Sequence, residues 1–289
     1  MAGYPSPPSL LRKYGLRAKK SWGQNFLADE AILDAIAALA VAAPGERVVE
    51  LGAGLGHLTA RLLLRGAEVL AVERDRDMAR VLRGELGDRV AVLEADAARL
   101  DYGELARRPS ANAGVPGAAP APRQVAVVGN LPYHLTSPIL FRLLDQSGWV
   151  SRAVLLLQRE VAERLAAAPG SRTWGLLSVL LQQRAEVTLE RVVPPGAFHP
   201  APRVESAVVR ISFGAPPVEV ADPERFRRLV KAGFAQRRKT LGNALRGGRI
   251  APAESLARAL ASSGVDPARR AETLTVAEWA ALERLLPRE

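Results

Sequence analysis

The stretch Val48-Val49-Glu50-Leu51-Gly52-Ala53-Gly54-Leu55-Gly56-His57-Leu58-Thr59 joins an apolar run to a helical pattern through a turn rich in glycine. The apolar run predicts a buried strand, and Leu58, Leu62 and Leu63 recur at helical spacing. Glycine lets the backbone approach a ligand closely, and the first turn of a helix offers free N–H groups. This order of strand, glycine loop and helix predicts a nucleotide-binding α/β domain.

The spacing of the glycines narrows the choice of cofactor. They follow the pattern Gly52-x-Gly54-x-Gly56, whereas dinucleotide-binding enzymes use G-x-G-x-x-G. The last glycine of that pattern allows close helix packing, and its position here is His57. The loop therefore favours a cofactor with adenosine and ribose but no pyrophosphate, which indicates S-adenosylmethionine. A nicotinamide-dependent oxidoreductase is correspondingly disfavoured.

Two acidic residues follow the next two predicted strands. The run 68–72 ends at Glu73, and the run 90–93 leads to Asp96. An acid at the end of the second strand suits a ribose diol, and Asp96 is placed to accept a hydrogen bond from an adenine amino group. Either acid alone is more simply a solvated loop residue. Two of them at successive strand ends beside a glycine loop favour cofactor binding.

A fourth apolar run, Val125–Val128, leads to Asn130-Leu131-Pro132-Tyr133. An exocyclic amine on a planar base is a poor nucleophile, because its lone pair is delocalised into the ring. The Asn130 side-chain oxygen and the Leu131 carbonyl can accept its two N–H bonds and turn the lone pair toward a methyl donor. Pro132 fixes the turn, and Tyr133 can stack on a base that has left its own stack. The alternative is a strand end followed by a proline turn and a core tyrosine.

Five separated blocks, in one order, give the chain a family resemblance. They are Lys19–Leu27 (KKSWGQNFL), the glycine loop with Glu73 and Asp96, Asn130–Tyr133, Phe198–Val208 (FHPAPRVESAV) and Phe234–Leu241 (FAQRRKTL). The chain resembles the ribosomal RNA adenine dimethyltransferases of the small-subunit methyltransferase A type over nearly its whole length. The resemblance implies S-adenosylmethionine as cofactor and N6,N6-dimethyladenosine as product. The implied substrate is a pair of adjacent adenosines in a hairpin loop near the 3′ end of small-subunit (16S) rRNA, methylated during ribosome biogenesis.

The resemblance also assigns roles by position. The implied catalytic residues are Asn130, Leu131, Pro132 and Tyr133, of which Asn130 holds the target amine and Tyr133 stacks on the base. The implied cofactor-binding residues are Gln24, Asn25 and Leu27, which belong to the segment that closes over the methionine part, together with Gly52, Gly54, Glu73, Asp96 and Asn130. Phe198 lies in a loop that the family places beside the target base. It either sandwiches the adenine opposite Tyr133 or plugs the mouth of the fold.

The positive charge of the chain gathers at its two ends. Residues 1–29 carry five Lys/Arg and one acid, residues 30–183 carry 17 of each, and residues 184–289 carry 18 Lys/Arg and 12 acids. A neutral cofactor domain flanked by basic segments is typical of a protein that grips RNA. The expected RNA contacts are Lys19 and Lys20 in the N-terminal arm and Arg237, Arg238 and Lys239 near the C-terminal end. The other arginines are more simply explained as surface residues that keep the protein soluble.

The N-terminal arm interleaves basic residues with Tyr14 and Trp22, a composition that suits loop RNA. We expect Trp22 to be partly buried and the lysines to make the contacts. The arm continues into Gln24–Leu27, which suggests that RNA binding and cofactor binding are coupled there.

Periodicity predicts an α/β fold with a mainly parallel sheet and a smaller C-terminal helical domain. The resemblance implies that this sheet is the Rossmann-like sheet of an S-adenosylmethionine-dependent methyltransferase. We expect a basic arm at 1–28, a methyltransferase domain at 29–214 and a helical RNA-binding domain at 215–289. Asp29 is the expected N-cap of a helix over 29–42. The Pro/Gly/Ala-rich residues 107–124 are expected to form a surface insert without chemistry. Ligands should lie at the carboxyl ends of the strands.

Composition excludes several classes of protein. With no cysteine and three scattered histidines, neither a disulfide nor a metal site is expected. No apolar run has membrane-spanning length, and Met1–Ser9 lacks the apolar core of a signal peptide. We therefore expect a cytoplasmic enzyme, monomeric, that acts on small-subunit rRNA or an immature small ribosomal subunit. Two alternatives stay open: a large-subunit rRNA adenine N6-methyltransferase of the antibiotic-resistance type, and a non-catalytic RNA-binding assembly factor.

Overall fold

A computed structural model describes residues 3–109, 124–236 and 238–287, and for Lys20 only the backbone. Most of the expected insert at 107–124 and the expected RNA contact Arg237 lie outside the described residues. The chain divides into two compact units. Unit 1 comprises Met1–Ala162 and Thr188–Phe213, and unit 2 comprises Glu163–Val187 and Gly214–Glu289.

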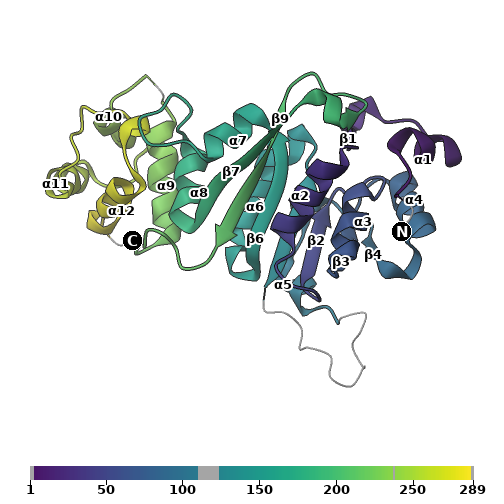
Figure 1. Ribbon diagram of the computed structural model, residues 1–289. Helices are drawn as coiled ribbons and strands as arrows, with labels where there is room; N and C mark the ends of the chain where they lie inside the picture. Colours follow the sequence, from purple (N-terminus) through teal and green to yellow (C-terminus); the bar gives the residue numbers. More distant parts are fainter. Residues whose placement is uncertain (1–2, 110–123, 237, 288–289) are drawn as a thin grey trace. The chain divides into compact units, whose positions relative to one another are not determined.

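A seven-stranded sheet in the order β4-β3-β2-β5-β6-β9-β7 organises unit 1 (Figure 1). Strands β2 to β6 pair in parallel, and β9 runs antiparallel to β6. The strands are β2 (Arg47–Leu51), β3 (Glu68–Val72), β4 (Ala91–Leu93), β5 (Val125–Asn130), β6 (Val150–Gln158), β7 (Ala185–Val193) and β9 (Ser206–Phe213). The helices between the parallel strands are α2 (Glu30–Ala40), α3 (His57–Leu64), α4 (Arg76–Leu86), α5 (Tyr102–Arg107) and α6 (Thr136–Asp145). The predicted α/β class with a Rossmann-like sheet is confirmed.

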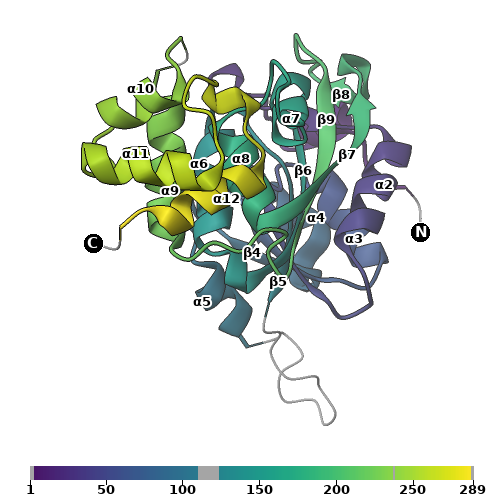
Figure 2. The ribbon, with the colours of Figure 1, turned by 90° about the vertical axis from the view of Figure 1, so that its left-hand side faces the viewer.

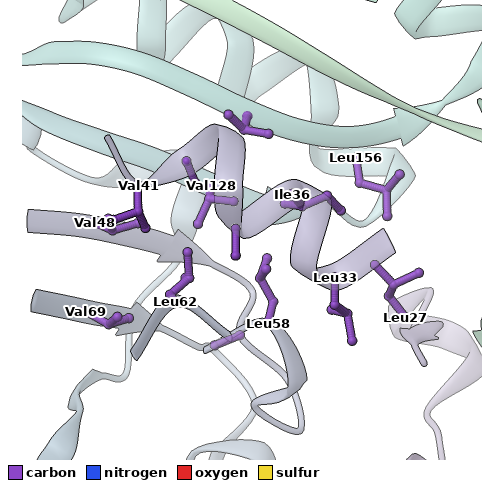
Figure 3. Close-up of a cluster of buried hydrophobic side chains, with 14 of the residues drawn as sticks. Leu27, Leu33, Ile36, Val41, Val48, Leu58, Leu62, Val69, Val128 and Leu156 are labelled. Carbon is purple, nitrogen blue, oxygen red and sulfur yellow. The ribbon is translucent and has the colours of Figure 1, made fainter. Parts of the chain in front are cut away.

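The core forms because the parallel strands are apolar on both faces. Val48, Val69 and Val128 pack in one buried cluster with Ile36 of α2 and Leu62 of α3 (Figure 3). The intervening strand residues are buried too, as the burial of every residue of β2 shows. The helix α2 begins where the sequence predicts, because the Asp29 side chain accepts the Ile32 N–H at 3.0 Å.

The N-terminal arm packs against helix α4 and the glycine loop of unit 1. Residues Pro7–Lys13 form helix α1, whose Leu10 and Leu11 are buried with Met78 of α4. The Tyr14 hydroxyl donates to Glu85 Oε1 at 2.8 Å. The basic arm therefore belongs to unit 1, and its apolar residues contribute to the core of that unit.

A second sheet of two short strands lies beside the large one. Strand β1 (Phe26–Leu27) pairs antiparallel with β8 (Phe198–His199), so Leu27 faces Phe198. This pairing joins the segment that the resemblance places over the cofactor to the Phe198 loop. Two-residue strands carry no period that a sequence pattern can reveal, and the pairing was not predicted.

Unit 2 is helical in its C-terminal part (Figure 2). Its helices are α8 (Leu176–Arg184), α9 (Pro223–Phe234), α10 (Leu241–Gly247), α11 (Ala253–Ser263) and α12 (Val276–Leu285), and α7 (Arg159–Leu165) spans the boundary between the units. The buried Trp174 donates its indole N–H to the Leu274 carbonyl at 3.1 Å. Residues 163–187, which sequence periodicity assigns to the methyltransferase domain, thus group with the C-terminal helices.

Replacing Gly129 by alanine is expected to lower the free energy of unfolding by about 1–3 kcal/mol or more. A Cβ at Gly129 in β5 would lie 2.5 Å from the Leu51 carbonyl oxygen, and backbone on two paired strands cannot yield easily. Gly148→Ala is the control, because a Cβ there meets nothing within 4 Å. Urea unfolding of both variants measures the difference. Equal midpoints would contradict the expectation.

Candidate functional site

A cavity of about 350 Å³ opens in unit 1 at the carboxyl ends of its parallel strands. Strand β2 leads into the cavity with neighbours β3 and β5 on either side, which is the position where doubly wound sheets bind ligands. The structure brings eleven of the twelve residues predicted to bind the cofactor or the target base into its lining, and Phe198 is the exception. The eleven are Gln24, Asn25, Leu27, Gly52, Gly54, Glu73, Asp96, Asn130, Leu131, Pro132 and Tyr133.

The glycine loop takes a shape that side chains would oppose. Gly52, Gly54 and Gly56 all have positive φ angles, of 69°, 55° and 86°. The Gly52 N–H donates to the Val72 carbonyl of β3 at 2.8 Å, so the loop stays attached to the neighbouring strand. At Gly54 a Cβ would lie 3.2 Å from the Phe26 ring. Glycine at these positions permits the positive φ angles and leaves room for the close approach of the Phe26 ring.

Glu73 connects the glycine loop to the end of β3. Its Oε2 accepts the Gly54 N–H at 2.8 Å and its Oε1 accepts the Asp75 N–H at 2.7 Å. The side chain is 8% exposed, and this burial raises the pKa of Glu73 against the opposing effect of its hydrogen bonds. Two backbone bonds therefore set the position of this carboxyl group, and its predicted contact with a ribose stays a prediction.

Asn130 is oriented by the N-terminal segment. Its Nδ2 donates to the Asn25 carbonyl at 2.8 Å, across 105 residues of sequence. Because the amide nitrogen is engaged there, Oδ1 is the group left to accept a hydrogen bond from a ligand. The contact also explains why Asn25 and Asn130 line the same cavity.

Tyr133 follows Asn130 at the start of a short 3-10 helix, Tyr133–Leu135. Its hydroxyl lies 3.1 Å from the Ser206 hydroxyl of β9, and the residue is half-buried. Leu131 is anchored through its N–H, which donates to the Leu156 carbonyl of β6 at 3.2 Å. The turn therefore holds the ring at the cavity while tying its backbone to the sheet.

Three side chains of the cavity lining, those of Trp22, Arg74 and Asp96, lie close together. Asp96 caps its own short helix by accepting the Ala98 N–H at 3.0 Å, and Arg74 lies 3.8 Å from its Oδ2. Trp22 is 39% exposed and also lines the cavity. The Arg74 guanidinium and the Lys19 ammonium each lie 5.5 Å from the centre of its ring. The expectation of partial burial for Trp22 agrees with this exposure.

The predicted RNA contact Lys19 is held within unit 1. Its Nζ lies 2.8 Å from both Asp75 Oδ1 and Asp77 Oδ2, and the bond to Asp75 contributes most to raising the pKa of Lys19. Gln24 strengthens the same junction by donating to Asp75 Oδ2 at 2.8 Å. The arm is thereby fastened to the start of α4, and a role of Lys19 in RNA binding stays a prediction.

Phe198 occupies a different position from the one beside the target base. Its side chain is 6% exposed and lies in the core cluster with Leu27 and Leu33, outside the cavity lining. This placement corresponds to the hydrophobic plug, the second of the two roles that sequence left open. Arg238 and Lys239 are exposed in unit 2, whereas Arg237 and the Lys20 side chain lie outside the described residues.

Sequence reasoning missed two acids, one in the cavity lining and one that contacts a lining residue. Glu50 lines the cavity although it is 2% exposed, and Asp75 receives both Lys19 and Gln24. Asp75 caps α4 by accepting the Asp77 N–H at 3.1 Å, a helix-start signal that the sequence does contain. Glu50 carried no comparable signal, because it falls inside an otherwise apolar strand.

The residues present fit the predicted cofactor. A cavity of about 350 Å³ lies within the range of small-molecule sites. The buried carboxyl of Glu73 suits a ribose, and the half-exposed Asp96 suits an adenine amino group. Gln24, Asn25 and Leu27 enclose the cavity from the N-terminal side.

The described residues offer neither a metal-binding cluster nor a helix that could span a membrane. Within ranges 3–109, 124–236 and 238–287, His, Asp and Glu side chains form no group of three or more that could hold a metal ion. Over the same ranges, each helix is too short or too polar to traverse a lipid bilayer.

A family profile matches nearly the whole chain. Residues 15–287 match the family described as "Ribosomal RNA adenine dimethylase". A protein of Anaeromyxobacter sp. (strain K) named "Ribosomal RNA small subunit methyltransferase A" is 69% identical over 98% of both chains. A Myxococcus xanthus protein of the same name is 50% identical over 97% of this chain and 95% of its own.

Solved structures resemble the chain as well. The 23S rRNA methyltransferase ErmE superimposes with a TM-score of 0.67 at 27% identity, over 91% of this chain and 99% of that one. A dimethyladenosine transferase from Plasmodium falciparum gives a TM-score of 0.72 at 22% identity, over 89% of this chain and 95% of that one. The second likeness concerns the fold alone.

Proposed function

Because the chain belongs to the ribosomal RNA adenine dimethylase family, we propose that it dimethylates the N6 amines of two adjacent adenosines in a hairpin loop near the 3′ end of small-subunit rRNA. It is an rRNA adenine N6,N6-dimethyltransferase, and S-adenosylmethionine is its cofactor. The observation that carries the proposal is the convergence of Glu73, Asp96 and Asn130 on one cavity beside the glycine loop. A relative at 69% identity with a small-subunit name favours this target over large-subunit rRNA.

The bound cofactor supplies an electrophilic sulfonium methyl group. The residues of this chain position its acceptor. Asn130, fixed by its bond to the Asn25 carbonyl, presents Oδ1 to an N–H of the target amine. The Leu131 carbonyl takes the other N–H, and the Tyr133 ring stacks on the extruded base. Catalysis then rests on orientation, which brings the amine into line with the methyl group.

Methyl transfer from labelled S-adenosylmethionine tests this function. Immature small ribosomal subunits and protein-free large-subunit rRNA are offered in parallel, and the RNA is digested to nucleosides. We expect dimethyladenosine in the small-subunit RNA alone. Label in the large-subunit RNA would move the assignment to a resistance-type enzyme. No label in either, with the cofactor still bound, would favour a non-catalytic assembly factor.

Tyr133→Ala is expected to raise the KM for immature small subunits by roughly 5- to 150-fold, since stacking on an aromatic ring contributes about 1–3 kcal/mol per base. Tyr133→Phe keeps the ring and loses only the hydroxyl contact with Ser206, so its effect should be small. Steady-state methylation assays compare the two variants. An equal loss in both would show that the hydroxyl, and not the ring, engages the substrate.

We infer that the RNA is gripped by the basic arm of unit 1 and by the exposed Arg238 and Lys239 of unit 2. We also propose that the substrate is the immature small subunit, that the enzyme is monomeric and that it acts in the cytoplasm.

Lys239→Gln should weaken RNA binding and lower the slope of log affinity against log salt by about 0.7–0.9. The exposed Arg172 in the same unit provides the control variant Arg172→Gln. Identical slopes in the two variants would show that Lys239 does not contact the RNA.

A further inference from the structure

Glu50 is the one acid of β2 and has no part in the positioning of the target base. The residue is 2% exposed, yet it lines the cavity. Thr59 of α3, itself fully buried, donates its hydroxyl to Glu50 Oε2 at 2.6 Å. Burying a charged carboxyl group without a cationic partner costs free energy, so the position of Glu50 indicates a functional role.

The charged groups around Glu50 leave it without a compensating cation among the described residues of the cavity lining. Glu73 at the end of β3 is close enough to disfavour the ionisation of Glu50. The Glu50 carboxylate in turn contributes to raising the pKa of Tyr4 in the arm. His57 at the start of α3 is neutral at physiological pH, because burial lowers its pKa to about 4. Arg74 is the cation of the described lining, and it is 62% exposed beside Trp22 and Asp96.

The missing cation corresponds to the chemistry of the cofactor. S-adenosylmethionine carries a sulfonium in addition to its ammonium and carboxylate groups, so its net charge is positive. Its product, S-adenosylhomocysteine, has a neutral thioether in the same place and no net charge. The two compounds otherwise share every group that the cavity can contact.

We propose that Glu50, held by Thr59, makes the cavity selective for the positively charged methyl donor over its neutral product. The inference concerns discrimination between two cofactor states, and it rests on the proposed function only through the identity of the cofactor. Such a preference would help to exchange product for a fresh donor between the two methylations of one adenine. Glu50 acts here through the charge of its carboxylate and is a specificity residue, not a catalytic one.

The protonation state of Glu50 gives the proposal a second signature. Burial raises the pKa of Glu50 to about 8, with Thr59 hydrogen bonds opposing and Glu73 adding to the increase. At pH 7 the carboxyl of the free protein is therefore mostly protonated. The ionised form attracts the sulfonium more strongly, so binding of the donor must release a proton below that pKa. The affinity for the donor should therefore rise as the pH increases through that pKa, and it should level off only where Glu50 is fully ionised.

Isothermal titration calorimetry tests the proposal by measuring how tightly each compound binds the full chain. Above the pKa of Glu50, where its carboxylate is ionised, we expect Glu50→Gln to lower the ratio of the Kd for S-adenosylhomocysteine to the Kd for S-adenosylmethionine about tenfold. Glu104→Gln, which removes an exposed carboxyl outside the cavity, should leave that ratio unchanged. A ratio that Glu50→Gln leaves intact would overturn the inference while leaving the proposed function standing.

A measurement on the unmodified protein keeps the inference testable even where Glu50→Gln fails to fold. Titrations at pH 7 in buffers of different ionisation enthalpy give the number of protons released on binding. We expect a release approaching about one proton with S-adenosylmethionine and clearly less with S-adenosylhomocysteine. Equal release with both compounds overturns the inference. If neither compound binds, the proposed function is overturned together with it.

Discussion

Replacing Asn130 by alanine is expected to lower kcat by about 100- to 1000-fold, the usual effect of removing one oriented hydrogen-bonding group from a reacting centre. The Asn130 amide is fixed before substrate arrives, because its Nδ2 donates to the Asn25 carbonyl at 2.8 Å. The variant keeps the glycine loop, Glu73 and Asp96, so its Kd for S-adenosylmethionine should change only a few-fold. Single-turnover methylation and cofactor titration measure the two quantities separately.

Asn130→Asp is the matched variant. It retains a side-chain oxygen acceptor and loses the Nδ2 donor, so it should retain more turnover than Asn130→Ala if the oxygen is what holds the target amine. Equal loss in both variants would assign the effect to the bond with Asn25. Turnover near normal in Asn130→Ala would remove Asn130 from catalysis. A parallel loss of cofactor binding would show that Asn130 acts mainly by binding the cofactor.

The parts of the site that sequence could predict are those that follow strands. Gly52, Glu73, Asp96 and Asn130 each stand at or just after the carboxyl end of a predicted parallel strand, and parallel strands end at one edge of a sheet. Local periodicity therefore placed these residues together without any knowledge of their contacts. The same holds for Asp29, whose capping role depends only on neighbouring backbone.

The parts that sequence could not predict depend on contacts between distant segments. The pairing of Leu27 with Phe198 buries a ring that the resemblance had placed near the target base. Lys19 reads as a basic arm residue, but its partners Asp75 and Asp77 lie 56 and 58 residues away. Glu50 is hidden for a different reason: an acid within an apolar strand has no local signature of its partner Thr59.

The boundary of the second unit illustrates the same limit. Periodicity places residues 163–187 with the sheet that they follow in sequence, whereas in the structure they group with the C-terminal helices. Two long-range bonds within unit 2 account for this grouping. Gln183 Nε2 donates to the Val218 carbonyl at 2.8 Å, and the Gly170 N–H donates to the Glu272 carbonyl at 2.8 Å. Such contacts between distant segments leave no trace in composition or spacing.

Replacing Arg225 by methionine is expected to destabilise unit 2 by about 3–5 kcal/mol, because it leaves a buried carboxylate without its cation. Glu283 is 0% exposed, and Arg225 of α9 contacts its Oε1 through Nε at 2.8 Å. The same carboxylate accepts the Ala221 and Asp222 N–H groups at 3.0 and 3.1 Å, where the chain enters α9. The pair therefore joins α12 to the start of α9, and its loss should loosen both helices.

Hydrogen exchange localises this effect better than a single unfolding curve, since a chain with two compact units need not unfold in one step. Amides of α9 and α12 should lose protection in Arg225→Met, while those of β2 and β5 keep theirs. The double variant Arg225→Met/Glu283→Gln should recover most of the protection, because glutamine is neutral and its oxygen still accepts a backbone N–H. A double variant no more protected than Arg225→Met would show that methionine packing, and not the stranded charge, is the cause.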